Sequence, residues 1–552
     1  MGRRHQKLAR RTVLANCGRT ALGLAAASSV DLFSGPSPAK AAAGNPQQRA
    51  LVYLDTDTPP SFDLDQTGIR LTEQLASACY GGDIVRYKIV EDRKAGVRLA
   101  DIYASGNTGI DPGLAAKIDL SNDQRVFTFH LRPDVKSSLG NPLTSDDVIW
   151  SFKRSIALKQ TGAFFANVMG VTEGKMEALD QHTVRFTLPT SNPIFLRVDA
   201  MKYYGGLFDA TAARAHATTA DPWAKAYLAS HTAGFSAYMA ESFIKGQQVT
   251  LVANPNWYQG APYYTRIVWR AVPESANRLS ALLRGDADIA AELTPPQLQR
   301  AAKTPGITVT SYIANKIKSI QLNLRYKPLA DRRVRQAIAY AIPYSEILNS
   351  VYFGTARLVK SPIPETYPDY TPDFWTYSTN LDKARALMKE AGQGPFPMTL
   401  TYSLAEYDNP LLAPIIRAAL KEIGITVTLN GVPDAVFVDR LYKHEGHAFL
   451  EDNWPFIAHP AYALWVYWNA TTVLNIGGWV NEEFDALLPR MLVELDDKKL
   501  AAMARRAQQI WEEEQPWILL ANPGWHVAHR SNVTNFVWYP DNDVRFQELQ
   551  GT

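Results

Sequence analysis

The chain of 552 residues contains only two cysteines, Cys17 and Cys79. This number is too small for a disulfide framework or for a cysteine cluster that binds a metal. Cys17 lies in the first forty residues, so its loss with an amino-terminal segment would leave Cys79 alone. An intrachain disulfide is then impossible, and the folded chain must be stabilised by packing and hydrogen bonds.

Long apolar runs are also missing. The longest candidate, Thr20–Val30, is shorter than the twenty or so apolar residues that a membrane-spanning helix needs. The apolar share of 46% and the charged share of 20% are ordinary for a globular protein. The net charge is +3, but residues 1–41 hold seven basic residues and one acidic residue, so the remainder carries −3. The basic balance therefore does not indicate nucleic acid as a partner.

No catalytic constellation is present in a recognisable form. The chain has no glycine-rich phosphate loop, no cysteine cluster and no Ser-His-Asp set with known spacing. Residues 234–237 begin like a nucleophile elbow but lack its closing glycine. His444 and His447 stand three residues apart, but Gly446 argues against a helix that would present both to one metal ion. We therefore predict no enzyme activity, no cofactor and no metal site.

The first forty residues have the pattern of an export signal. A basic segment precedes the weakly apolar stretch Thr20–Val30, and the small-residue site Ala39–Ala41 follows. Arg10-Arg11 resembles the twin-arginine export motif, with a chance arginine pair in an ordinary secretion signal as the alternative. Cys17 precedes the apolar stretch, which is the wrong place for a lipoprotein cysteine. We predict a signal over residues 1–41, cleaved near Ala41, and a freely diffusing periplasmic protein.

The stretch from Val126 to Ser155 predicts a strand, a turn and a capped helix. Large apolar side chains occur at every second position, at Phe127, Phe129 and Leu131, with polar or smaller residues between them. This period of two is typical of a β-strand. Pro133 and residues 140–142 then break the pattern. Residues 144–147, Thr-Ser-Asp-Asp, place a capping side chain and acids at the start of a helix, where the helix dipole favours negative charge.

The same stretch resembles the signature of the family 5 solute-binding proteins of bacterial ABC importers, the dipeptide- and oligopeptide-binding type. FTFHLRPDVK and GNPLTSDDVIWSFKR match that signature, although Ser137–Leu139 replace its usual Phe-His-Asp. Further segments match the family in the same order, so the resemblance covers nearly all of the chain after the signal. These segments are residues 176–188, 249–290, 319–342, 475–488 and 508–520.

The resemblance implies an α/β fold of the type II periplasmic-binding-protein kind. Two lobes with mixed sheets enclose a ligand cleft, and the first lobe carries an extra subdomain. We expect the first lobe over residues 42–288, the second over 289–510, and a return to the first over 511–552. Strand, helix and strand over residues 398–427 favour parallel pairing in the second lobe. A monomer is expected.

The loop that binds the ligand amine in peptide-binding members corresponds to residues 449–462, FLEDNWPFIAHPAY. If His459-Pro460 aligns with the family's Asp-Pro, Phe456 occupies the position of the amine-binding Asp. Either Glu451 or Asp452 takes over that role, or the amine clamp is absent. Trp454 lies within the loop and is a candidate for stacking on a ligand, with core packing as its alternative. The candidate binding residues are therefore Glu451, Asp452, Trp454, Phe456 and His459.

The resemblance implies a periplasmic receptor that captures a small solute and delivers it to a membrane permease. A peptide or peptide-like solute is favoured, followed by an opine or other amino-acid derivative and then an oligosaccharide. Two other classes remain open at this point: a secreted hydrolase, and a periplasmic chaperone or sensor without a transport role.

Overall fold

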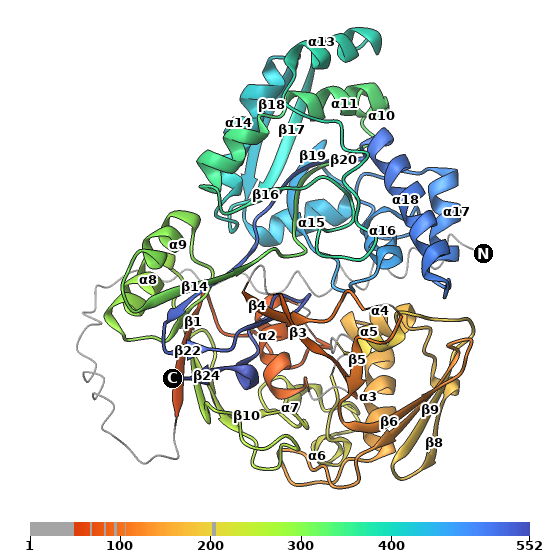
Figure 1. Ribbon diagram of the computed structural model, residues 1–552, viewed down its shortest axis with the longest axis vertical. Helices are drawn as coiled ribbons and strands as arrows, with labels where there is room; N and C mark the ends of the chain where they lie inside the picture. Colours follow the sequence, from red (N-terminus) through yellow and green to blue (C-terminus); the bar gives the residue numbers. More distant parts are fainter. Residues whose placement is uncertain (1–48, 67–68, 82–83, 93–95, 105, 201–205) are drawn as a thin grey trace.

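A computed structural model of the chain describes residues 49–66, 69–81, 84–92, 96–104, 106–200 and 206–552. The expected export signal lies outside the described residues. In these described ranges, no helix combines the length and apolar character needed to cross a membrane. Two lobes lie one above the other in Figure 1.

A seven-stranded mixed sheet forms the frame of the first lobe, at the lower left of Figure 1. Strand β1 (Ala50–Asp55) lies in its middle and pairs in parallel with two neighbours, β12 and β13. Its buried side chains include Leu51 and Tyr53. The order across the sheet is β10 (Tyr238–Ile244), β11 (Gln248–Ala253), β12 (Arg266–Ala271), β1, β13 (Ile289–Ala290), β21 (Trp525–Arg530) and β14 (Ile307–Tyr312).

The extra subdomain of the first lobe is a four-stranded antiparallel sheet packed against helix α3, at the lower right of Figure 1. On strand β7, Phe127, Phe129 and Leu131 are buried as their alternation predicts. The Asp147 carboxylate accepts a hydrogen bond from the backbone N–H of Thr144 at 2.8 Å and closes the predicted helix cap. The elements are β6 (Ala115–Leu120), β7 (Val126–Leu131), β9 (Thr183–Thr187), β8 (Met176–Asp180), α3 (Ser145–Leu158) and α4 (Thr161–Val168), which packs against α3.

A six-stranded mixed sheet forms the second lobe, at the top of Figure 1. The order across it is β16 (Arg357–Leu358), β20 (Trp517–Asn522), β15 (Ile317–Leu322), β19 (Ala448–Asn453), β17 (Phe396–Ser403) and β18 (Ile425–Val432). Strands β17 and β18 pair in parallel and are joined by α14 (Asn409–Lys421), which confirms the predicted strand–helix–strand unit. The chain turns after α14 at Gly424, whose φ of +85° is open to glycine without steric cost.

Helices surround both sheets. In the first lobe they are α2 (Arg70–Cys79), α4 (Thr161–Val168), α5 (Phe195–Asp199), α6 (Ala210–Ala215), α7 (Lys225–Leu228), α8 (Ser275–Arg284) and α9 (Pro295–Ala302). In the second lobe they are α10 (Lys327–Ala330), α11 (Arg332–Ala341), α12 (Tyr344–Glu346), α13 (Leu381–Glu390), α15 (Asp434–Lys443), α16 (Pro460–Trp468), α17 (Glu482–Met491) and α18 (Asp497–Glu514). Short strands complete the first lobe: β2 (Val85–Tyr87), β3 (Ile89–Asp92), β4 (Val97–Ala100), β5 (Ile110–Pro112), β22 (Val533–Thr534), β23 (Val537–Trp538) and β24 (Gln550–Gly551).

The chain passes from one lobe to the other at residues 313–316 and again at 523–524. These positions differ from the expected boundaries after residues 288 and 510. Strands β13 and β14, which follow residue 288, pair within the first sheet, and β20, which follows residue 510, pairs within the second. A strand pattern marks a strand without telling which of two sheets it joins, and this explains the difference.

Candidate ligand-binding cleft between the lobes

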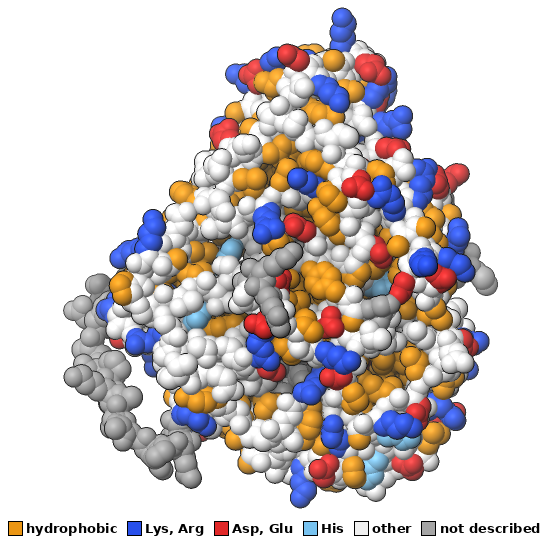
Figure 2. Space-filling view, viewed as in Figure 1, with side chains coloured by type: hydrophobic (Ala, Val, Ile, Leu, Met, Phe, Trp, Pro, Cys, Tyr) orange, Lys and Arg blue, Asp and Glu red, His pale blue; other side chains and the backbone are white. Residues whose placement is uncertain are grey.

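A cavity of about 110 Å³ lies between the lobes, beside the two connecting segments. Residues from both lobes and from the connections line it, among them Tyr53, Arg70, Glu292, Lys316, Tyr407, Trp454, Pro523, Trp525 and His526. A second cavity of about 490 Å³ shares Thr355, Gly524 and His526 with the first. The space between the lobes therefore extends along the connecting segments. In Figure 2, acidic and basic side chains lie among hydrophobic ones along the boundary between the lobes.

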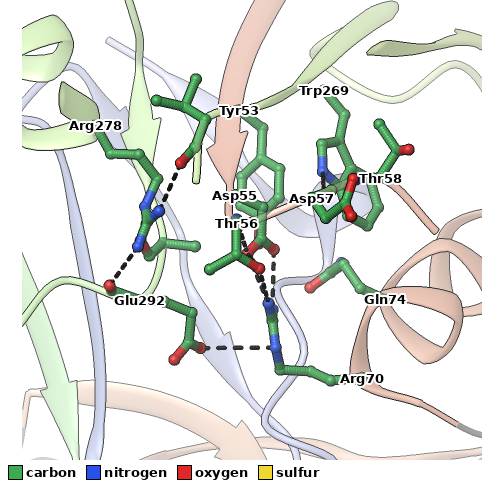
Figure 3. A network of polar contacts seen from close by, with 12 residues as sticks. Tyr53, Asp55, Thr56, Asp57, Thr58, Arg70, Gln74, Trp269, Arg278 and Glu292 are labelled. Carbon is green, nitrogen blue, oxygen red and sulfur yellow. Dashed lines mark hydrogen bonds and ion pairs between the residues drawn. The ribbon is translucent and has the colours of Figure 1, made fainter. Parts of the chain in front are cut away.

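The floor of this cavity in the first lobe is a charged network at the end of β1 (Figure 3). Arg70 donates two hydrogen bonds to the buried carboxylate of Asp55, at 2.9 and 2.6 Å. Tyr53 donates a third through its hydroxyl, at 2.9 Å. Burial alone would raise the pKa of Asp55, but the Arg70 guanidinium outweighs it and lowers that pKa below its ordinary value. Asp55 is therefore a charged anchor that orients Arg70 toward the cavity.

Glu292 reaches the same cavity from the loop after β13 (Figure 3). Its Oε1 lies 3.9 Å from Arg70 Nε, and its side chain is 47% exposed. The backbone of Glu292 has a φ of +50°, a conformation that residues other than glycine rarely adopt. Arg278 fixes this loop because its guanidinium donates to the carbonyls of Ala291 and Glu292, at 2.9 and 2.7 Å. Strained backbone held in this way is common at ligand sites.

The second lobe brings a buried ion pair to the edge of the cleft. Lys318 Nζ lies 3.0 Å from a carboxylate oxygen of Asp408 and 4.0 Å from one of Asp452. Burial alone would lower the pKa of Lys318, but the two carboxylates raise it above its ordinary value. Tyr352 also donates to Asp408, at 2.6 Å. The charge of Asp452 is thus partly balanced within the protein.

The five residues predicted for the site fall into two groups. Trp454 lines the cavity. Glu451 and Asp452 precede Trp454 in the sequence and belong to the end of strand β19. Phe456 instead contacts the extra subdomain, because its ring lies 6.1 Å from that of Phe165 on α4. The structure therefore places an aromatic contact between the lobes where an amine-binding carboxylate was considered.

His459 has a structural position. Its side chain is buried and its Nδ1 accepts from the backbone N–H of Ala461 at 3.3 Å, which caps helix α16. Burial, with a smaller contribution from Arg197, lowers the pKa of His459 to about 3. A neutral imidazole in a helix cap needs no ligand to explain it.

Asn315, in the first connecting segment, holds the candidate binding loop in place, and the sequence did not indicate this role. Its side-chain amide donates to the carbonyls of Pro455 and Pro540, at 2.9 and 2.8 Å, and to the Tyr367 hydroxyl at 2.8 Å. Pro455 directly follows Trp454, and Pro540 belongs to the first lobe. One buried amide therefore ties the candidate binding loop to both lobes. No motif marks such an asparagine, since its role depends on contacts far apart in the sequence.

Two other sequence features have structural explanations. Asp63, in the loop after β1, is buried and pairs with the buried Arg154, as does Asp65. His447 stacks on Tyr326, and its Nδ1 accepts from the backbone N–H of Thr399 at 3.1 Å. Across the residues that the structure describes, no group of three potential metal ligands comes together.

Comparison with protein families agrees with this architecture. The model described as "Bacterial extracellular solute-binding proteins, family 5 Middle" matches residues 109–475, which is more than half of the chain. The chain belongs to this family. Of the family 5 relatives, the probable D,D-dipeptide-binding periplasmic protein DdpA of Escherichia coli is 29% identical over 442 residues, covering 79% of this chain and 83% of that protein. Di/tripeptide-binding protein 2 of Pseudomonas aeruginosa is 27% identical over 476 residues, covering 81% and 88%.

Solved structures show the same family 5 fold. The Helicobacter pylori periplasmic binding protein DppA, in complex with the peptide STSA, superimposes with a TM-score of 0.78 at 24% identity, covering 92% of this chain and 99% of that one. MoaA of Agrobacterium tumefaciens, in complex with mannopinic acid, gives a TM-score of 0.76 at 23% identity, covering 92% and 100%. The expected two-lobed fold is thereby confirmed.

Proposed function

We propose that this family 5 protein is the receptor of an ABC importer and that it captures a peptide or peptide-like solute. The observation that carries the proposal is the cavity between the lobes, which takes its lining from both lobes and from the segments that connect them. A solute held there contacts both lobes at once, so its binding free energy favours their closed arrangement. A membrane permease can then recognise the closed form and accept the solute.

The proposed class of solute is supported by what the names of the relatives say they bind. The names of the E. coli and P. aeruginosa proteins state that they bind D,D-dipeptides and di- or tripeptides. The charged groups of this cleft suit a zwitterion, since Arg70 and Lys316 lie in the same cavity as Glu292. An opine is the second candidate, because MoaA was solved with mannopinic acid and because Phe456 would occupy the position of the family's amine-binding Asp if His459-Pro460 aligns with the family's Asp-Pro.

Native mass spectrometry of protein purified from its own cell envelope tests both candidates. The bound molecule is released by denaturation and identified by fragmentation. A peptide bound one to one is the expected result. A sugar-containing amino-acid derivative would favour the opine candidate, and protein that binds no member of a broad solute library would contradict the receptor function altogether. Incubation of the pure protein with the identified solute should leave that solute intact, because the proposed role includes no turnover.

Export to the periplasm and a monomeric state complete the proposal. The support for export is the signal pattern of residues 1–41 together with the periplasmic relative of E. coli. Replacement of Arg10-Arg11 by Lys-Lys should abolish export if the twin-arginine route is used, and cell fractionation measures this. Normal export of the Lys-Lys variant would favour the general secretion route instead. Light scattering of the purified protein tests the monomer.

A further inference from the structure

The larger cavity between the lobes, of about 490 Å³, takes its lining from both of them, for example from Tyr103 of the first and Thr366 of the second. Ligand pockets usually measure about 300–1,000 Å³. The smaller cavity, of about 110 Å³, falls below this range, and the larger one lies within it. Because the two share Thr355, Gly524 and His526, one solute can occupy both, with most of its volume in the larger cavity.

Two tyrosine rings form aromatic walls of the larger cavity. Tyr312, at the end of β14, is 8% exposed, and its ring packs against that of Trp538 with centroids 5.0 Å apart. Tyr103, in the loop after β4, is 50% exposed, so much of its ring is available to a ligand. Strand β4 pairs with β23, which contains Trp538, and the loop of Tyr103 therefore starts beside the support of Tyr312. Such rings offer an apolar face together with a polar hydroxyl.

The other side chains that line the larger cavity are nearly all polar. Ile313 is the one aliphatic side chain among its described lining residues. An apolar side chain of a peptide would find few partners there. The polar residues are Asp92, Ser311, Thr355, Arg357, Glu365, Thr366, Asn522 and His526.

The charges of this lining are largely compensated within the protein. Arg357 donates to the Glu365 carboxylate at 3.2 Å, and Asp92 has a partner within the protein as well. His526 is neutral, because its Nε2 donates to a backbone carbonyl at 2.9 Å and its Nδ1 accepts from the Ser311 hydroxyl at 2.8 Å. Burial also lowers the pKa of His526. The group that enters the cavity therefore needs hydrogen-bonding atoms and no charge of its own.

Thr366 supplies a hydroxyl that lacks a partner. The residue lines the larger cavity and is 2% exposed, and its buried Oγ1 makes no hydrogen bond with any residue that the structure describes. Buried polar atoms are paired in almost all folded proteins, because loss of water without a replacement hydrogen bond is costly. A ligand in the cavity can provide the missing partner.

We propose that the larger cavity binds a neutral polyhydroxylated group of the solute, a sugar ring or an open-chain polyol, with Thr366 as one of its hydrogen-bond partners. This inference rests on the proposed solute-binding function and names the chemistry of the part that this cavity holds. Hydroxyls donate and accept through the same atom, which suits a lining of carboxylates, a guanidinium, an amide and hydroxyls. Their carbon skeleton can lie against the rings of Tyr103 and Tyr312. The solute is then a peptide or amino-acid derivative that carries such a group.

Isothermal titration of the full-length mature protein with two matched pairs of probes tests this. The first pair is O-glucosyl-Ser-Ala and O-benzyl-Ser-Ala, and the second is N-(1-deoxymannityl)-alanine and N-hexylalanine. Each pair compares a hydroxylated group with an apolar group attached at the same place. We expect at least one hydroxylated probe to bind at least tenfold more tightly than its apolar counterpart. The pair in which this occurs distinguishes a sugar ring from an open chain.

Two substitutions link this preference to the cavity. Thr366→Val keeps the shape of the side chain and removes its hydroxyl, so it should bind the preferred hydroxylated probe at least threefold more weakly and the apolar counterpart unchanged. Its thermal midpoint should not fall, because the free protein loses no hydrogen bond. Tyr103→Ala should also weaken binding of the hydroxylated probe at least threefold. Thr219→Val, at an exposed threonine, is the matched control and should change none of these values.

Hydroxylated probes that bind no more tightly than their apolar counterparts would overturn the inference and leave the receptor function standing. Wild-type affinity for the preferred probe in Thr366→Val would do the same. If no probe binds, the peptide part of the proposed function fails, and thermal melting with D-glucose and D-mannitol decides the inference. A rise of the wild-type midpoint that exceeds the rise in Thr366→Val supports it, and any other result overturns it.

Discussion

The ring of Phe456 lies against the ring of Phe165, with centroids 6.1 Å apart and planes inclined by 68°. Phe456 belongs to the binding loop of the second lobe and Phe165 to the extra subdomain of the first. Phe164 and Trp465 form a second such pair, with centroids 6.2 Å apart. The extra subdomain is therefore part of the contact that forms when the lobes meet.

Replacement of Phe456 by alanine should weaken solute binding. Aromatic pairs contribute about 0.5–1.5 kcal/mol beyond the area they bury, so the affinity should fall about threefold to tenfold. The effect should be the same in Phe165→Ala and no larger in the double variant, because each change removes the same contact. Isothermal titration with the natural solute measures all three. Phe353→Ala, at an exposed phenylalanine, is the control, and additive losses in the double variant would contradict the contact.

Replacement of Asn315 by alanine should destabilise the connection between the lobes. The change removes the donor to the Pro540 carbonyl and one of the two donors to the Pro455 carbonyl, which keeps its hydrogen bond from the Tyr367 hydroxyl. Loss of buried hydrogen bonds costs about 1–3 kcal/mol, and we expect a decrease of the unfolding free energy in that range. Urea unfolding measures it, with Asn532→Ala at an exposed position as the control. An unchanged midpoint would show that the amide does not tie the segments together.

Substitutions at Glu292 can distinguish the effect of its strained backbone on stability from the effect of its carboxylate on solute binding. Glu292→Gly should be as stable as wild type or more stable by up to about 1 kcal/mol, because glycine adopts the φ of +50° without strain. Glu274→Gly, where φ is −80°, should be less stable by a few tenths to about 1 kcal/mol. Thermal melting compares the two.

Solute affinity is expected to respond to the charge at position 292 alone. Glu292→Gln keeps the strained backbone and removes the carboxylate from the cavity, so it should change affinity by the same factor as Glu292→Gly. Titration of both variants with the natural solute checks this. A large difference between them would mean that backbone geometry, and not the carboxylate, controls binding.

Asp65 should make the protein less stable as the pH rises. Burial, opposed by Arg154 and reinforced by Asp63, raises the pKa of Asp65 to about 7. The folded chain therefore binds more protons than the unfolded chain between about pH 4 and pH 7, and the unfolding free energy falls through this window. We expect a decrease of about 1–3 kcal/mol, since one pKa unit corresponds to about 1.4 kcal/mol. Denaturant unfolding at pH 5 and pH 8 measures it.

The variant Asp65→Asn should remove most of this pH dependence. Asparagine keeps an oxygen that can accept from Arg154, which donates to Asp65 at 2.7 Å, but it has no proton to lose. The control is Asp123→Asn, at an exposed aspartate. If the wild-type slope persists in Asp65→Asn, another buried carboxylate is responsible.

Much of the fold was predictable because its signals are local. The alternation in β7, the cap at Thr144 and the strand–helix–strand unit of β17, α14 and β18 each depend on nearby residues, and all three occur in the structure. The lobe boundaries were not predictable in the same way. Whether β14 or β20 pairs with the first or the second sheet depends on partners that lie hundreds of residues away.

The candidate site was predictable only in part. Trp454 was expected at the cleft from its loop, and it lines the cavity. Arg70 and Lys318 were not indicated, because neither belongs to a motif and each gains its position from a carboxylate on another element.

The two connecting segments have a consequence for the architecture as a whole. Tyr312 at the end of β14 lies opposite Trp525 at the start of β21, and these strands are neighbours in the first sheet. The whole second lobe is thus a single insertion between two adjacent strands, and a short turn from Tyr312 to Trp525 would restore an ordinary hairpin. Recombination at these two positions could exchange the second lobe between relatives as a cassette. New ligand preferences could then arise without any change in the strand order of the first lobe.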